Sequence, residues 1–139
     1  MAINSAAQKY RSVYNTSAVT DASPHQLISL LFGGVLDNLS AAKGAIEQNN
    51  VALKGEKLGR AIEIVDNLRS VLNTDIGGEV ADNLAALYDY MESRLLTANI
   101  DSDEGIVDEV ALLMKEIKLG WDAIPEEERL HSAANSEQR

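Results

Sequence analysis

The sequence predicts an all-α protein, an antiparallel four-helix bundle of the up-down type, from three observations. The chain has 139 residues and is 45% hydrophobic but only 4% aromatic, so aliphatic side chains must form most of its core. Its two prolines, Pro24 and Pro125, leave about a hundred residues between them without proline, which suits long helices. Within this interval apolar residues recur at helical spacing in four segments, and short connections make consecutive helices antiparallel.

The chain is predicted to have three parts. Residues 1–22 form a flexible N-terminal arm of small and polar residues, residues 23–124 form the four-helix bundle, and residues 125–139 form a short charged C-terminal tail. In the arm, Tyr10 and Tyr14 are spaced i, i+4, so a helical turn would place both on one face. The arm is therefore either a loose polar segment or a segment that packs its tyrosines over an apolar groove of the bundle.

The first helix is predicted to run from Pro24 to about Gln48. Ser23 and Gln26 have the spacing of a capping box, in which each side chain bonds to the backbone N–H of the other residue. Pro24 falls at the first helical position, where its missing N–H costs nothing. His25, in the first turn, is expected on the surface. The apolar face consists of Leu27, Leu31, Val35, Leu39, Ala42 and Ile46.

The second helix is clear from Glu56 to Asn73, and Val51 to Lys54 are a candidate first turn. Its apolar arc spans about half of the helical wheel, which is wider than a coiled-coil seam, so this helix is expected to contact more than one neighbour. Its central face consists of Leu58, Ala61, Val65, Leu68 and Leu72, and one flank carries Ile64 and Val71.

The third helix is predicted to start after the turn that ends at Gly77 and Gly78, because glycine adopts positive φ without strain. Ala86 and Tyr90 point away from its main face, and Arg94, four residues after Tyr90, is expected to lie along the tyrosine ring. The main face consists of Val80, Leu84, Leu87, Met91, Leu95 and Ala98, with Tyr88 at one edge.

The fourth helix follows a connection predicted at residues 99–102 and runs to about Ala123, with Asp101 or Ser102 as its N-cap. Leu112 and Leu119 form a separate stripe at i, i+7 on the side opposite the main face. A further short turn is predicted after Pro125. The main face consists of Ile106, Val110, Leu113, Ile117, Trp121 and Ile124.

The composition and motifs exclude several classes of function. A net charge of −10 disfavours binding to nucleic acid, and no apolar run is long enough for membrane insertion. The start of the chain lacks the pattern of a cleaved signal peptide, and the absence of cysteine is compatible with the cytoplasm. His25 and His131 are the only histidines, and there is no Glu-x-x-His pair or phosphate-binding loop. We therefore expect no enzyme activity, no catalytic residues, no metal and no cofactor.

The remaining feature is apolar surface beyond what a single helical seam needs. It lies on the second, third and fourth predicted helices. Either these helices pack broad faces within the bundle, or the surplus forms a groove for helices of a partner. The residues concerned are Ile64, Val71, Ala86, Tyr90, Leu112 and Leu119.

Four stretches of the chain resemble the flagellin-specific export chaperones, the FliS family. The resemblance covers roughly residues 6 to 121, and its most specific part is the run from the double glycine to the paired tyrosines. Gly34 departs from the family pattern, in which an acidic residue is common at this position. The matching stretches are Ala22-Ser23-Pro24-His25-Gln26-Leu27-Ile28 with Leu31-Phe32-Gly33-Gly34, Lys54-Gly55-Glu56 with Ala61-Ile62-Glu63-Ile64-Val65, Gly77-Gly78-Glu79 with Leu87-Tyr88-Asp89-Tyr90-Met91, and Glu109-Val110 with Leu113 and Trp121.

The resemblance implies a chaperone of the bacterial cytosol. Such a protein binds the disordered C-terminal segment of flagellin, prevents premature polymerisation, and aids delivery to the flagellar type III export apparatus. Export-gate components, flagellar regulatory proteins and a second copy of the chain are further partners that the resemblance admits. We expect Tyr10 to act as a lid over the flagellin-binding track, which is predicted to use Ile64, Leu68, Val71, Ala86, Tyr90, Leu112 and Leu119.

An alternative function needs no flagellin. The same apolar stripes would serve a regulatory or self-associating helical-bundle adaptor. The two hypotheses differ in what drives assembly, because a chaperone forms a complex only when flagellin is present.

Overall fold

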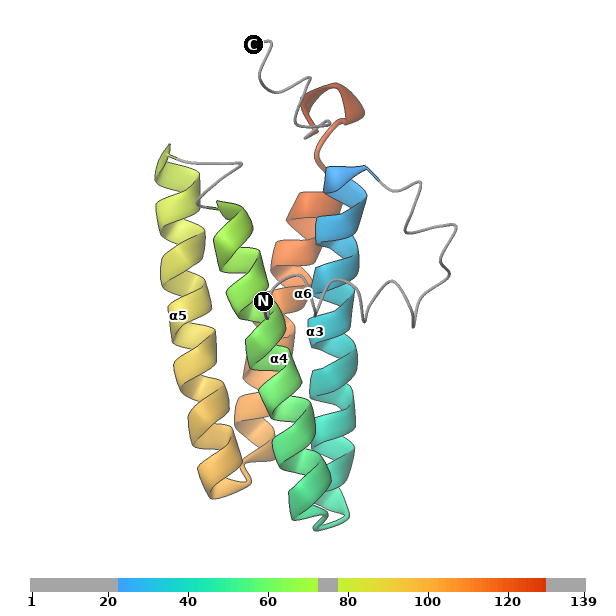
Figure 1. Cartoon of the computed structure of the whole chain (residues 1–139), viewed down its shortest axis with the longest axis vertical. Helices are drawn as coiled ribbons and strands as arrows, with labels where there is room; N and C mark the ends of the chain where they lie inside the picture. The colour runs from blue at the N-terminus through green and yellow to red at the C-terminus, as the bar shows by residue number, and fades with distance from the viewer. Residues whose placement is uncertain (1–22, 73–77, 130–139) are drawn as a thin grey trace.

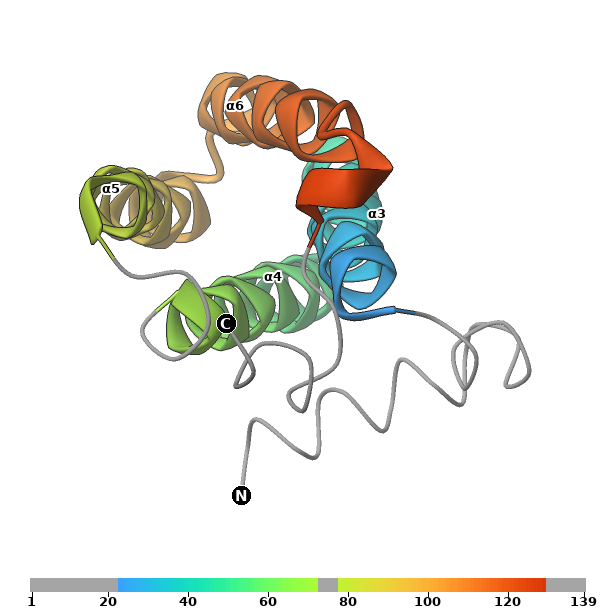
Figure 2. The same cartoon turned by 90° about the horizontal axis from the view of Figure 1, so that it is seen from above.

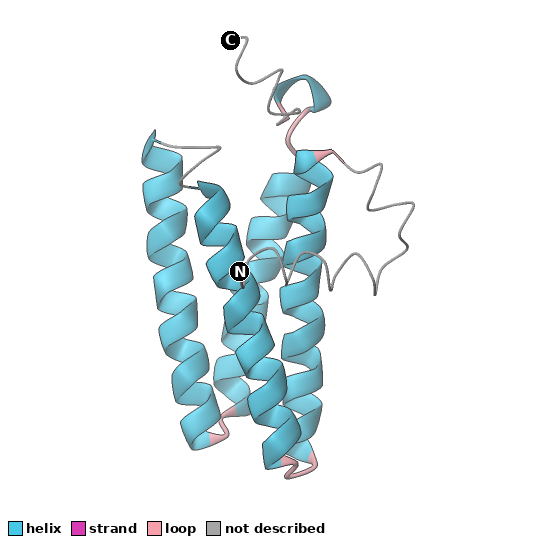
Figure 3. Ribbon diagram, in the orientation of Figure 1, coloured by secondary structure: helices cyan, strands magenta, loops and turns pink. Residues whose placement is uncertain are grey.

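The structure, a computed structural model, describes residues 23–72 and 78–129, and the described part is helical (Figures 1 and 3). It contains four long helices, namely α3 (Pro24–Glu47), α4 (Val51–Val71), α5 (Gly78–Asp101) and α6 (Glu104–Asp122), followed by a short 3-10 helix, η2 (Glu126–Glu128). The predicted arm, most of the predicted tail and the loop at residues 73–77 lie outside the described residues.

The four helices form an antiparallel bundle in up-down order. Each helix packs against the helices before and after it in sequence, and α6 returns to pack against α3. The view along the bundle in Figure 2 shows the helices at the corners of a four-sided arrangement. The contacts of α3 with α4 and α6 are more extensive than those of α5, so α5 is the least tightly packed member. The predicted fold class is confirmed.

Local signals at the starts of three helices explain where those helices begin. Ser23 and Gln26 form the predicted capping box, with the Ser23 N–H donating to Gln26 Oε1 at 2.8 Å and the Gln26 N–H to Ser23 Oγ at 3.2 Å. Asn50 caps α4 by accepting from the backbone N–H of Leu53 at 3.1 Å. The candidate first turn at Val51 is therefore part of the second helix.

The connection between α5 and α6 differs from the prediction. Helix α5 continues to Asp101, through residues predicted as a loop, and the cap of α6 is Asp103 instead of Asp101 or Ser102. Ser102 has a φ of 51°, in the left-handed region, and this single residue reverses the chain. The Asp103 side chain then accepts from the N–H of Ile106 at 3.2 Å. The turn is tighter than the sequence indicated, so the cap comes later.

The core follows the predicted face of α4, whereas α3 and α6 bury only part of their predicted faces and α5 presents a different face. The predicted face residues that are only half-buried are Leu27, Leu31 and Ile46 of α3 and Leu113, Ile117 and Trp121 of α6. Val80 and Leu87 were predicted on its buried face, yet they are 62% and 37% exposed, while Tyr88 is 1% exposed. A tyrosine ring removes more apolar area from water than a leucine side chain, which favours the orientation that buries Tyr88. Burial also raises the pKa of the Tyr88 phenol. The predicted edge of α5 is therefore part of its core face.

Candidate functional site

The outer faces of α5 and α6 carry the exposed part of the predicted binding track. Tyr90 is 44% exposed on α5, and Leu112 and Leu119 are 58% and 71% exposed on α6. Ala86, one turn before Tyr90, is also exposed. Helices α5 and α6 pack against each other, so these four exposed residues lie on two adjacent helices. We call this set, Ala86, Tyr90, Leu112 and Leu119, the outer stripe.

A polar cluster joins the two helices within the outer stripe. The Tyr90 hydroxyl donates to Glu109 Oε2, and Arg94 Nε donates to Glu109 Oε1 at 3.1 Å. These two hydrogen bonds hold the pKa of Glu109 below its ordinary value, and the bond to Glu109 raises the pKa of Tyr90. Arg94 was predicted to lie along the Tyr90 ring, whereas its guanidinium bonds to the carboxylate that also receives the tyrosine hydroxyl. The cluster therefore fixes the direction of the Tyr90 side chain.

The α4 members of the predicted track have a different position. Ile64 and Leu68 are 1% and 2% exposed and belong to the hydrophobic core, so in this fold they offer no outer surface. Ile64 was predicted as a surplus residue on the flank of its helix, and that placement is corrected here. Val71 is half-buried and packs against the core. Tyr10 lies outside the described residues.

An apolar cleft lies at the end of the bundle where α3 and α5 begin and α4 and α6 end. It has a volume of about 690 Å³, and Leu68 and Val71 line it together with residues of the other three helices. We call it the end cleft. The helical periodicity did not predict this cleft, although it did place Val80 and Leu84 on the apolar face at the start of the third helix. Its apolar lining is Ile28, Phe32, Leu68, Val71, Leu72, Val80, Leu84, Ile117, Trp121 and Ile124.

His25 and Trp121 form one wall of the end cleft. Their rings stack at a centroid distance of 4.7 Å with 8° between the planes. The indole N–H of Trp121 donates to the backbone carbonyl of His25 at 2.9 Å, and His25 Nε2 lies 2.7 Å from the carbonyl oxygen of Trp121. Because a carbonyl can only accept, Nε2 carries the proton. His25 is 2% exposed, so the expectation of a surface histidine was wrong.

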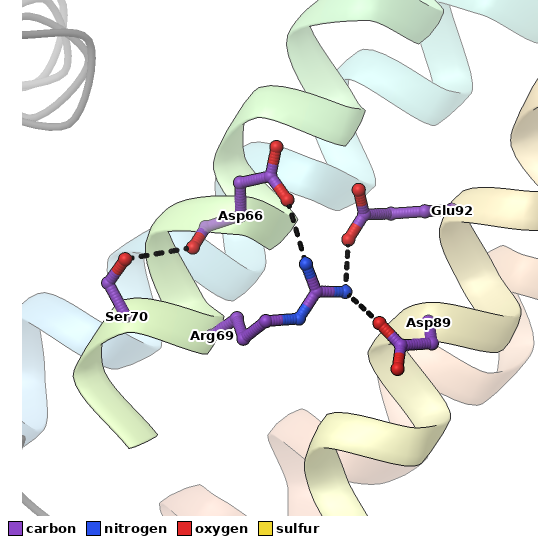
Figure 4. Close-up of polar contacts among 5 residues, drawn as sticks. All are labelled: Asp66, Arg69, Ser70, Asp89 and Glu92. Carbon is purple, nitrogen blue, oxygen red and sulfur yellow. Dashed lines mark hydrogen bonds and ion pairs between the residues drawn. The ribbon is translucent and has the colours of Figure 1, made fainter. Parts of the chain in front are cut away.

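An ion cluster centred on Arg69 joins α4 to α5 (Figure 4). The guanidinium of Arg69 contacts Asp66 at 3.0 Å on its own helix, and Asp89 and Glu92 on α5 at 2.5 Å each. Burial, with a contribution from Asp66, raises the pKa of Glu92. One cation thus holds three carboxylates, and this cluster links the loosely packed helix α5 to the rest of the bundle. These residues were not predicted to have a role, because they lie on the polar faces of their helices and are far apart in the sequence.

The described residues contain neither a candidate metal-binding site nor a membrane-spanning helix. Within residues 23–72 and 78–129 no group of three or more His, Cys, Asp or Glu side chains has the geometry to hold a metal ion. In the same part of the chain, no helix has the length and apolar character that crossing a bilayer needs.

The fold and its surface define a class: a small helical bundle whose surface features are an exposed apolar stripe and an apolar cleft, as expected of a protein-binding protein. Comparison with known families then places the chain, because the family described as "Flagellar protein FliS" matches residues 6–128. The chain belongs to the FliS family of flagellar proteins. The predicted family is confirmed, and since its members are chaperones, so is the prediction that the protein is not an enzyme.

Individual relatives match over most of their length. The chain is 44% identical over 119 residues to the flagellar secretion chaperone FliSB of Pseudomonas aeruginosa, covering 86% of this chain and 94% of the relative. It is 47% identical over 116 residues to the flagellar secretion chaperone FliS of Salmonella typhimurium, covering 83% and 86%. The FliS chaperone of Bacillus subtilis is 33% identical over 124 residues, covering 89% and 92%. The similarity therefore extends over most of this chain.

Proposed function

We propose that this protein is an export chaperone for flagellin in the bacterial cytosol. It binds the disordered C-terminal segment of newly made flagellin, prevents premature polymerisation, and aids delivery to the flagellar type III export apparatus. The observation that carries the proposal is the match to flagellar secretion chaperones over 83% to 89% of the chain. A protein of this function needs an apolar surface and no catalytic centre, because a disordered partner folds as it binds.

The outer stripe is the proposed main contact for flagellin. Its leucines are more than half exposed, and Tyr90 presents an aromatic ring held in place by Glu109. An amphipathic segment that laid its apolar face along α5 and α6 would cover these side chains, and its polar face would remain in water. Arg94 and Glu109 then provide polar contacts beside the apolar ones.

The α4 residues support the track from the side of the end cleft. Val71 and Leu68 line that cleft, so a bound segment that reached it would contact them there. Ile64, buried beneath, contributes to the shape of α4 and not to a direct contact. We propose that Tyr10 acts as a lid, which an arm of residues 1–22 would place over the flagellin-binding track in the absence of flagellin.

The test is calorimetric titration with a peptide of the flagellin C-terminal segment. The double variant L112D/L119D places two charges on the outer stripe and is expected to weaken binding by about tenfold or more. Ile100→Asp is the matched control, because Ile100 is 82% exposed on α5 but lies outside the stripe. These positions are exposed, so the variants are expected to stay folded, whereas Ile64→Asp would place a charge in the core.

The outcomes separate the outer stripe from the broader function. Binding that L112D/L119D leaves unchanged would remove the stripe from the proposal while keeping the chaperone. Failure of the wild-type protein to bind the flagellin peptide would contradict the function itself. Light scattering then tests the alternative adaptor, because self-association without flagellin would favour it. Export-gate components and flagellar regulatory proteins are proposed as further partners.

A further inference from the structure

The end cleft combines a buried apolar floor with an exposed apolar rim. Ile28, Phe32 and Leu68 form part of its floor and are each at most 6% exposed. Val80, at the rim on α5, is 62% exposed. An apolar hollow of about 690 Å³ that opens to water gains free energy when apolar side chains fill it.

The last described stretch of the chain forms a wall of the same cleft. Ile124, Glu128 and Arg129 all line it. Arg129 is held there by two hydrogen bonds, from its Nε to the carbonyl oxygen of Ile124 at 2.8 Å and from its terminal guanidinium nitrogen to that of Asp122 at 3.3 Å. The chain therefore leaves the described structure at the edge of the cleft.

The residue that follows Arg129 has an apolar side chain, which is the kind of group that an apolar cleft binds. Leu130 is the only large aliphatic side chain among residues 130–139. Its Cα is one peptide unit, about 3.8 Å, from that of Arg129. Among residues 130–139, Glu137 and Arg139 are the only side chains with a full charge, and their charges cancel. This segment therefore brings no net side-chain charge to a cleft whose lining already includes Glu116, Glu128 and Arg129.

We propose that the end cleft is an intramolecular docking site for the start of the C-terminal tail, and that Leu130 is the side chain it takes. A leucine attached one residue from the cleft wall has an effective concentration of millimolar order or higher, which favours it over any dilute partner. Docking covers part of the apolar lining and leaves the outer stripe untouched. A separate chain that inserts an apolar side chain into the end cleft must first displace Leu130.

Trp121 provides a local probe, because it is the only tryptophan of the chain and lines the cleft. The experiment compares the full-length protein with L130S, using Ala133→Ser in the same tail as the matched control. Quenching of tryptophan fluorescence by acrylamide is expected to rise about twofold in L130S, with stronger fluorescence of an added anilinonaphthalene sulfonate dye, because the apolar lining becomes accessible. Ala133→Ser is expected to behave as the wild type.

Two results would overturn the inference. One is equal quenching and dye fluorescence in L130S and the wild type, with helical content unchanged by circular dichroism. The other is wild-type dye binding that falls as protein concentration rises while light scattering reports a dimer, which would assign the cleft to a second copy. Neither result bears on flagellin binding at the outer stripe, so the proposed function is tested separately.

Discussion

His25 and Trp121 show what individual side chains contribute at the ends of the bundle. They are 96 positions apart, yet they stack and exchange two hydrogen bonds, each with the other's backbone carbonyl. Phe32 adds an edge-on contact to the same indole at 6.2 Å. The pair thus joins the first turn of α3 to the last turn of α6 and closes one side of the end cleft. A periodic pattern cannot reveal such a pair, because His25 stands outside the apolar repeat of its helix.

Replacing His25 by Ala is expected to destabilise the protein by about 1–3 kcal/mol, because the stacked ring is lost and the carbonyl of Trp121 loses its donor. Urea unfolding followed by circular dichroism measures the change. His131→Ala, in the tail, serves as a control for the loss of an imidazole. A stability equal to that of the wild type would mean that water replaces the histidine contact at no cost.

At the scale of elements, each helix begins where a local signal satisfies its first N–H groups or where the backbone turns. The capping box at Ser23 and Gln26 and the asparagine cap of α4 were readable from short-range chemistry. The start of α6 could not be predicted in this way, because it depends on the left-handed conformation of Ser102. Serine rarely adopts this conformation, so its presence in the sequence does not indicate it. Element boundaries were therefore predicted well where a capping side chain decides them and less well where a backbone reversal does.

Ser23→Ala removes the side-chain half of the capping box and is expected to cost about 1 kcal/mol of stability. Ser40→Ala, at an exposed position within α3, is the matched control and should change stability by less than about 0.5 kcal/mol. The change in the free energy of unfolding for each variant is obtained from its urea midpoint, with the m-value held constant. Equal effects of the two substitutions would show that the cap is dispensable.

At the scale of the whole molecule, α5 is the helix that is held least firmly. Its contacts with α4 and α6 are less extensive than those of α3, and the ion cluster of Arg69 with Asp89 and Glu92 supplements its packing against α4. The same helix carries two residues of the outer stripe, Ala86 and Tyr90, and the exposed rim of the end cleft. Both candidate binding surfaces are therefore built partly on the helix that has the least extensive contacts with the rest of the bundle.

Arg69→Met is expected to loosen α5 selectively. The three carboxylates lose their common cation and repel one another, so amide hydrogens of α5 should exchange about tenfold faster, while those of α3 change little. Hydrogen exchange followed by mass spectrometry measures this difference by segment. Lys43→Met, which removes an exposed ion pair between α3 and α6, is the control. A uniform increase over all helices would instead indicate a general loss of stability.

The amino-acid sequence by itself determined the helical class, the order of the four helices, the core face of α4 and part of the core faces of α3 and α6. These features depend on composition and on the spacing of apolar residues, because in a helix this spacing determines which residues share a face. It also indicated the exposed residues Tyr90, Leu112 and Leu119 of the outer stripe, because they lie off the main faces of their helices.

Only the tertiary structure decided the rest. It placed Ile64 in the core, turned α5 so that Tyr88 is buried, and brought His25 to Trp121. It also formed the end cleft, one wall of which is the last described stretch of the chain. The physical reason is that burial depends on how helices rotate and separate against their neighbours. Those angles follow from the packing of all four helices together and not from the pattern of any one.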